Sequence, residues 1–271
     1  MPIWFRKTLA AFSILMFFSS GITLSLLFFP LVALVTFSRE RQRSFSTWAL
    51  ATSYPLFLGW LKFWHLIDYD RIPLPPDLPK DRAFVVVASH PTLMDVIFCM
   101  GWFRLLTVVK ASWYRSWTLR FVTRMTHYIP AAGLPDDGGD FEPSLDRMVA
   151  QLKLGRSLIT FPEGTREPHG KLLRFHRGPF EVAVRAGVPV VPLFIATDKP
   201  FLLRGSMLPT ERMTYTFEWL PFIDCAAEDI EPAKLRNRVH RMFEERRAQY
   251  TEERNSAAPA LTEGQAPSAG S

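Results

Sequence analysis

The chain has 271 residues, enough to bury one substantial core, so one folded domain with an appendage is the expected organisation. Its net charge of +6 and its isoelectric point near 9.5 favour anionic partners such as nucleic acid, acidic lipid or an acidic carrier protein. Hydrophobic residues make up 48% of the chain and are concentrated toward its N-terminus. That distribution favours a membrane partner and argues against a nucleic-acid-binding protein.

Two uncharged runs near the N-terminus predict hydrophobic membrane-anchoring helices over residues 1–66. The first run covers residues 8–38, which exceeds the roughly 20 residues that a helix needs to cross a bilayer, and it contains Pro30, where a break or kink is expected. A basic link at 39–43 separates it from the second run, at 44–61. Apolar sequence continues where a cleaved signal peptide would end, so cleavage is not expected.

The sequence leaves the membrane topology of this segment open. Arg6 and Lys7 precede the first run and three arginines follow it, so the positive-inside rule does not assign an orientation. One alternative is a hydrophobic hairpin that enters one leaflet with both ends in the cytosol. The other is a single membrane span followed by an interfacial helix. We expect a bacterial-type inner membrane, with the folded domain on its cytoplasmic face.

Beyond residue 81, short apolar runs typical of strands buried on both faces alternate with amphipathic helical patterns. This alternation predicts an α/β domain with a mixed, mainly parallel sheet flanked by helices. Strands are expected at 83–88, 105–109, 157–161, 188–196 and 213–223, and helices at 144–154, 179–186 and 232–254.

Composition sets the predicted domain limits. Prolines between residues 73 and 79 mark a linker over residues 67–80, and the folded domain is expected over 81–254. Residues 255–271 are rich in Ala, Pro, Gly and Ser, a composition that predicts a disordered tail.

The first candidate site is Ser-His-Pro-Thr-Leu-Met-Asp at residues 89–95, where the valine-rich strand ends. Catalytic groups of parallel α/β sheets gather at such strand ends. With His90 ahead of a helix and Pro91 in its first turn, Asp95 can reach back toward the imidazole, and a histidine oriented by a carboxylate is a general base. The alternative is structural: Thr92 and Asp95 also fit a capping box, which would leave His90 as an ordinary loop residue.

The second candidate site is Phe-Pro-Glu-Gly-Thr-Arg at residues 161–166, which also follows an apolar strand. Gly164 lets the backbone approach a ligand closely, Arg166 offers a planar fork for phosphate or carboxylate, and Glu163 can accept hydrogen bonds from hydroxyls. The alternative is a surface turn with a weak ion pair between Glu163 and Arg166.

The two segments, in this order, resemble the glycerolipid acyltransferase family, whose first motif is His-x4-Asp and whose third is Phe-Pro-Glu-Gly-Thr-Arg. Both motifs are matched letter for letter. The likeness continues through residues 175–180 and through the Val-Pro-Val-Val-Pro block at 188–192, which is similar to the family's fourth motif. It spans residues 83–195, with a hydrophobic pair of helices in front.

The resemblance implies an O-acyltransferase of phospholipid biosynthesis in which His90 is the general base and Asp95 holds its tautomer and charge. The acceptor would be a lysophospholipid such as 1-acylglycerol-3-phosphate, and the donor acyl-CoA or an acyl carrier protein. Membrane lipids would be partners, and no metal or redox cofactor would be needed. The implied acceptor-binding residues are Glu163, Gly164, Thr165 and Arg166, and the donor-side candidates are Pro192 and Arg177.

One departure from the family pattern concerns the acceptor. The family's second motif usually ends in an arginine that helps to bind the acceptor phosphate, but the corresponding stretch here, residues 126–133, has none. Arg120, Arg124 and Lys110 are candidates to replace it. The alternative acceptor is therefore a lipid hydroxyl without a glycerophosphate, as in an amino-acid lipid or a polyene-type lipid.

Two other classes of protein fit the sequence less well. A hydrolase of the usual kind would carry a Gly-x-Ser-x-Gly elbow, which the sequence lacks. A non-catalytic lipid-binding protein would explain the apolar N-terminus but would need neither motif.

Overall fold

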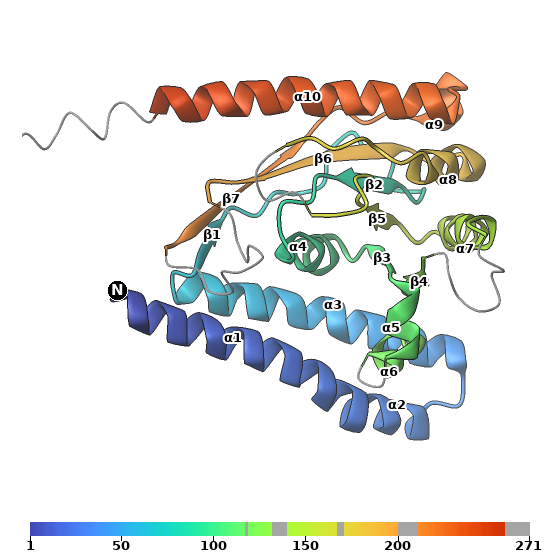
Figure 1. Cartoon of the computed structure of the whole chain (residues 1–271). Coiled ribbons are helices and arrows are strands. Elements are labelled where there is room, and N and C mark those ends of the chain that lie inside the picture. Colours follow the sequence, from blue (N-terminus) through green and yellow to red (C-terminus); the bar gives the residue numbers. More distant parts are fainter. Residues whose placement is uncertain (117–118, 132–139, 167–170, 200–210, 258–271) are drawn as a thin grey trace, which may run out of the picture.

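A computed structural model describes residues 1–116, 119–131, 140–166, 171–199 and 211–257. A central β-sheet is covered by helices on both faces, and a helical hairpin from the N-terminus lies along one side of the domain (Figure 1). This architecture confirms the predicted α/β fold with a mixed, mainly parallel sheet.

The sheet has seven strands in the order β1-β7-β6-β2-β5-β3-β4. Neighbouring strands run parallel from β6 to β4, β7 runs antiparallel to β6, and β1 runs parallel to β7. The carboxyl ends of β2 and β5 therefore lie at the same edge of the sheet. In chain order the strands are β1 (Ile67–Tyr69), β2 (Val85–Ala88), β3 (Leu106–Val109), β4 (Ile129–Pro130), β5 (Leu158–Thr160), β6 (Val190–Thr197) and β7 (Met213–Trp219).

Strand β2 is buried on both faces because alternate side chains enter two different apolar layers. Val86 and Ala88 pack with the helices on the hairpin side, whereas Val85 and Val87 pack with the helices on the opposite side. The second layer is covered by α7 (Glu142–Lys153), α8 (Gly178–Ala186) and α10 (Pro232–Ala257). Short helices complete the domain: α5 (Ala111–Arg115), α6 (Arg120–Arg124) and α9 (Cys225–Glu228).

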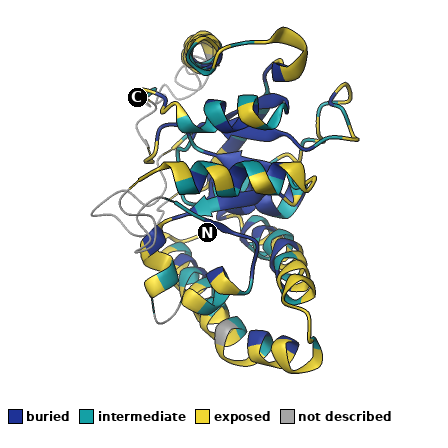
Figure 2. Ribbon diagram, turned by 90° about the vertical axis from the view of Figure 1, so that its right-hand side faces the viewer, coloured by how far each residue is buried: buried dark blue, intermediate teal, exposed yellow. Residues whose placement is uncertain are grey.

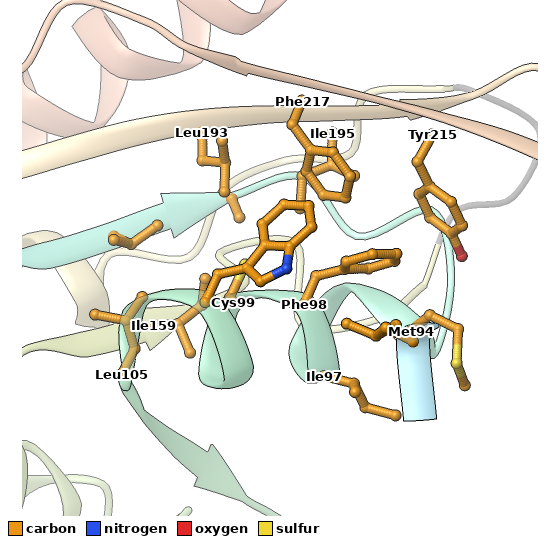
Figure 3. Close-up of a cluster of buried hydrophobic side chains, with 14 of the residues drawn as sticks. Met94, Ile97, Phe98, Cys99, Leu105, Ile159, Leu193, Ile195, Tyr215 and Phe217 are labelled. Carbon is orange, nitrogen blue, oxygen red and sulfur yellow. The ribbon is translucent and has the colours of Figure 1, made fainter. Parts of the chain in front are cut away.

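Helix α4 (Met94–Phe103) lies between the sheet and the hairpin, in the apolar layer on the hairpin side, which we call the first apolar layer. Phe98 is fully buried, and its ring lies 4.9 Å from the rings of both Tyr215 and Phe217 on β7 (Figure 3). On the other side of α4, a Cβ on Gly101 would lie 3.0 Å from the ring of Pro55. The missing side chain thus allows the hairpin to approach α4 closely.

The first arm of the hairpin is one long apolar helix, α1 (Ile3–Thr23) and α2 (Phe29–Val35), joined by a π-helical turn (Leu24–Phe28). Pro30 lacks the N–H that an α-helix would bond four residues back, and the wider turn just before it accommodates this loss. By length and composition, residues 3–35 could cross a membrane, and within the described residues no other helix meets that test.

The second arm, α3 (Arg39–Phe63), is attached to the folded domain along its length. Near its end Leu58 is fully buried in the first apolar layer. In its middle the hydroxyls of Tyr54 and Tyr128 lie 3.1 Å apart, and near its start Ser44 Oγ lies 3.2 Å from His127 Nε2. Because one face of α3 contacts the folded domain, only the other face of this helix is available for contact with lipid.

That opposite face is apolar and exposed. Figure 2 shows exposed residues along much of the hairpin. The large exposed side chains of α3 are Phe45, Trp48, Leu56 and Phe63, and those of the first arm include Trp4, Phe12, Leu15, Phe18, Leu27, Leu31 and Leu34. Exposed apolar surface on this scale marks an interaction site, and here it faces away from the folded domain.

The observed elements cross the predicted domain limits at the linker and at the tail. Residues 67–69, at the start of the predicted linker, form strand β1 and pair with β7. Residues 255–257, at the start of the predicted tail, continue α10, and residues 258–271 lie outside the described part of the chain.

The two faces of α3 predict opposite effects for two neighbouring leucines. Leu58→Ala, at a site with 0% exposure, should lower the free energy of unfolding by about 2–5 kcal/mol because it leaves a cavity in the core. Leu56→Ala, at a site with 75% exposure, should leave it unchanged within about 0.5 kcal/mol and instead weaken binding to lipid vesicles. Denaturant unfolding in detergent micelles and vesicle flotation measure the two effects, and equal destabilisation by both variants would contradict this packing.

Candidate active site

The loop that carries His90 begins where β2 ends, and β6 holds it in place. Ser89 Oγ donates a hydrogen bond to the Ile195 carbonyl at 2.8 Å and lies 2.7 Å from the Ile195 N–H, which donates to it. Ser89 is buried, so these bonds are shielded from water. The position of His90 is thereby set by the strand next to its own.

Asp95 is fully buried in the first turn of α4 and is surrounded by donors from the preceding loop. His90 Nδ1 lies 3.0 Å from Asp95 Oδ2, and the Thr92 backbone N–H donates to the same oxygen at 2.7 Å. The Thr92 hydroxyl donates to Asp95 Oδ1 at 2.8 Å. Asp95 therefore contacts the imidazole and fixes the loop before α4 through Thr92, while Leu93, at the N-cap position of α4, provides no side-chain cap.

Tyr215, on β7, extends this cluster into the core. Its hydroxyl lies 2.7 Å from Thr92 Oγ1. Because the Thr92 hydroxyl proton is already directed to Asp95, Tyr215 is the donor of this bond. The pattern of the sequence did not indicate Tyr215, since the pairing of β6 with β7 alone brings it here.

Burial raises the pKa of Asp95, because the carboxylate loses its hydration. The contact with His90 and the bonds from Thr92 oppose this rise by favouring the ionised form. An ionised Asp95 selects the imidazole tautomer with the proton on Nδ1, which leaves Nε2 to accept a proton.

The second segment, residues 161–166, lies beside His90. The Phe161 ring stacks on the imidazole at 4.1 Å between centroids, with an angle of 24° between the ring planes. The His90 side chain is 14% exposed, so the stacking covers most of the ring while leaving a path to solvent or substrate. The structure thus brings the two predicted segments together, whereas the stacking itself has no counterpart in the sequence pattern.

Glu163 lies inward rather than at the surface. It is 5% exposed, and its Oε2 accepts the backbone N–H of Leu173 at 3.2 Å. Burial raises the pKa of Glu163, while the bond from Leu173, the charge of Arg247 and the backbone N–H of His90 lower it. The Glu163 carboxylate thus connects its own segment to the backbone at Leu173.

Gly164 has a left-handed backbone conformation, with φ at +69°, and it lies under the side chain of His176. An added Cβ would lie 3.0 Å from His176 Nε2 and 3.1 Å from its Cδ2. The His176 N–H donates to the Pro162 carbonyl at 2.8 Å, which fixes this close approach. The positive φ favours glycine here, and a larger residue would also require the His176 side chain to shift by a few tenths of an ångström.

The remaining predicted residues occupy different surroundings. Thr165 and Arg166 are exposed at the end of the segment, and Arg177, also exposed, pairs with Glu181 on α8. Pro192 is buried in β6 opposite Val87 of β2. Of the stretch that departs from the second family motif, residues 126–131 are described, and residues 132 and 133 lie outside the described part. Lys110 directly follows β3. Arg120 and Arg124 are the first and last residues of α6, the helix that precedes β4.

The comparisons with known proteins agree with one another. A family model described as acyltransferase matches residues 74–196. The chloroplastic 1-acyl-sn-glycerol-3-phosphate acyltransferase LPAT1 of Arabidopsis thaliana is 28% identical over 194 residues, 68% of this chain and 49% of that protein. The human 1-acyl-sn-glycerol-3-phosphate acyltransferase alpha is 28% identical over 134 residues, 45% of this chain and 44% of that protein. The chain thus spans about half the length of the curated relatives it matches.

A solved structure shares the fold. The crystal structure of the 1-acyl-sn-glycerophosphate acyltransferase of Thermotoga maritima superposes with a TM-score of 0.69 at 22% identity, covering 91% of this chain and 98% of that one. These findings agree with the acyltransferase match and the related sequences: residues 74–196 match the acyltransferase family model, and the chain is similar in sequence and in fold to glycerolipid acyltransferases.

The environment of Gly164 predicts an unequal effect of two glycine substitutions. Gly187 also has a positive φ, +63°, but a Cβ there would meet nothing within 4 Å. Gly187→Ala should therefore lower the free energy of unfolding by about 1–2 kcal/mol through backbone strain alone. Gly164→Ala should cost more, because it must also displace His176. Thermal unfolding of the two variants tests this, and an equal cost would show that the His176 contact exerts no constraint.

Proposed function

We propose that the protein transfers a fatty acyl chain from acyl-CoA or acyl carrier protein to a hydroxyl of a lysophospholipid such as 1-acylglycerol-3-phosphate. The observation that carries this proposal is the contact of His90 Nδ1 with the buried Asp95 at 3.0 Å, beside the Phe-Pro-Glu-Gly-Thr-Arg segment. The names of the related proteins support the same reaction.

The proposed reaction follows from the tautomer of His90, whose Nε2 is free to accept a proton. His90 Nε2 accepts the proton of the acceptor hydroxyl while the hydroxyl oxygen attacks the thioester carbonyl carbon. The tetrahedral intermediate then expels the thiolate, which takes the proton from His90, and the products are the ester and the free thiol. Asp95 stabilises the imidazolium between these steps. The reaction needs no covalent acyl-enzyme, and neither metal nor redox cofactor enters it.

The hairpin supports a location at the membrane surface. Its exposed apolar face points away from the folded domain, while α3 is attached to that domain from Ser44 to Leu58. We therefore favour a hairpin that enters one leaflet and keeps the domain at the cytoplasmic face of the inner membrane. A lipid acceptor could then reach His90 without leaving the bilayer.

The base role of His90 predicts a loss of turnover without a loss of folding. His90→Ala should lower kcat by about a hundredfold to ten-thousandfold, the usual contribution of general-base catalysis, and Asp95→Asn should lower it strongly as well. Transfer of labelled acyl chains from acyl-CoA to lipid measures this effect, with expression and vesicle binding as controls. Near-normal turnover by purified His90→Ala protein would refute the mechanism.

Because Arg166 is exposed, we expect it to discriminate between acceptors with and without a phosphate group. If its guanidinium binds the acceptor phosphate, Arg166→Ala should raise the KM for lysophosphatidate about tenfold to a hundredfold and leave a neutral hydroxylated lipid unaffected. Arg177→Ala is the matched comparison, since this exposed arginine lies at the start of α8 and should alter the KM for the acyl donor instead. An unchanged KM for lysophosphatidate would favour the second candidate, an acceptor without a phosphate, which the missing second-motif arginine supports.

A further inference from the structure

Tyr215 occupies a tightly packed position in the core beside the site. It is 3% exposed, its ring stacks on that of Phe217 with 5.7 Å between centroids, and β7 pairs at this residue with both β6 and β1. Figure 3 shows its hydroxyl directed toward the start of α4. Because close packing restricts both the ring and the strand, the hydroxyl of Tyr215 has a defined position.

The Thr92 hydroxyl accepts the bond from Tyr215 and has a full set of partners. The Tyr215 hydroxyl donates to Thr92 Oγ1 at 2.7 Å, and the Met94 N–H donates to the same oxygen at 3.0 Å. A hydroxyl group has two acceptor lone pairs and one proton. With both lone pairs engaged, the proton is left for the bond to Asp95 Oδ1 at 2.8 Å. Tyr215 thus fixes the direction in which Thr92 donates.

The bond from Thr92 in turn sets the plane of the Asp95 carboxylate. Oδ2 accepts the Thr92 backbone N–H and lies 3.0 Å from His90 Nδ1, while Oδ1 accepts the Thr92 hydroxyl. The terminal torsion of an aspartate is soft, so a carboxylate bonded at one oxygen can still rotate. Bonds at both oxygens prevent that rotation. Loss of the bond at Oδ1 would therefore loosen the contact at Oδ2 that orients His90.

The simpler explanation of the bond is that a buried tyrosine hydroxyl needs a partner of its own. Two features favour a role in the site instead. The partner of Tyr215 is the same hydroxyl that Asp95 uses, and Thr92 and Asp95 are 1% and 0% exposed, so water does not compete for these bonds. Hydrogen bonds in series also polarise and strengthen one another in such a dry environment.

We propose that Tyr215 is a positioning residue of the active site, which acts through the Thr92 hydroxyl to fix the Asp95 carboxylate and, with it, the imidazole of His90. This inference rests on the proposed function, because the imidazole serves the acyl transfer proposed above. It also extends the site beyond residues 74–196, the part that the family model matches, to a strand near the C-terminal end of the domain.

The first test is the steady-state kinetics of acyl transfer, with each variant assayed below its unfolding temperature. Tyr215→Phe removes one buried oxygen atom and should lower kcat about threefold to tenfold, the effect of one buried hydrogen bond. The KM values for acyl-CoA and lysophosphatidate should stay unchanged, because Tyr215 is buried in the core. In the Thr92→Val background the same substitution should change kcat by less than about twofold, because the link to Asp95 is already broken.

Two further variants serve as comparisons for the kinetics. Tyr69 is the register partner of Tyr215 on β1, and its ring lies at the same 4.9 Å from that of Phe98, so Tyr69→Phe is the matched control and should leave kcat unchanged. Thr92→Ser keeps the hydroxyl and should retain most of the activity that Thr92→Val loses. An unchanged kcat in Tyr215→Phe, a matching rise in KM, or the same fold-loss in both Thr92 backgrounds would overturn the proposal.

A second test does not depend on activity. Tyr215→Phe should lower the unfolding temperature by a few degrees, because Thr92 loses a buried partner. In the Thr92→Val background it should leave the unfolding temperature unchanged or raise it, because the phenol hydroxyl there has already lost its acceptor. An equal decrease in both backgrounds would overturn the link. If the unsubstituted protein acylates no lipid but the unfolding temperatures show this coupling, the proposed function fails and the link from Tyr215 to Thr92 stands. If it acylates lipid and Tyr215→Phe keeps full kcat, the function stands and the positioning role fails.

Discussion

The buried carboxylate of Asp95 is the constraint on which the site depends. A charged group without contact to water is tolerated only where hydrogen-bond donors replace its hydration, and here they come from Thr92 and His90. The loop between β2 and α4 must therefore fold around Asp95. Ser89 attaches the start of this loop to β6, and Tyr215 attaches its middle to β7. The imidazole is held by a polar centre that two neighbouring strands enclose.

The same helix connects this polar centre to the N-terminal hairpin. Helix α4 begins at the site, with Asp95 in its first turn, and packs against α3 through Gly101, where a side chain would collide with Pro55. The apolar surface of α3 that faces away from the domain is thus held at a defined position relative to His90. On the opposite side of the sheet, α10 packs on the segment that follows Glu163. The site lies between the layer of helices that includes the N-terminal hairpin and the layer that includes α10.

The sequence predicted correctly those features that depend on residues close to one another in the chain. The valine-rich run of β2, the glycine that ends α8 and the two motif segments all follow from neighbouring residues, and the family resemblance was carried by those segments. Contacts between distant residues were not predictable in this way. Strand β1 exists because three residues pair with β7, and Phe161 meets His90 only because β5 and β2 are adjacent. The inward position of Glu163 likewise depends on Leu173 and α10, which no spacing in its own motif indicates.

The central claim is that His90, oriented by Asp95, promotes direct transfer from a thioester to a lipid hydroxyl. Its most direct test is to incubate the unsubstituted protein with radiolabelled acyl-CoA, with and without lysophosphatidate, and to locate the label after denaturation. The account predicts that no label remains on the protein in either case and that acylated lipid forms only when the acceptor is present. Stoichiometric acyl-protein without the acceptor, or free fatty acid in place of acylated lipid, would contradict it.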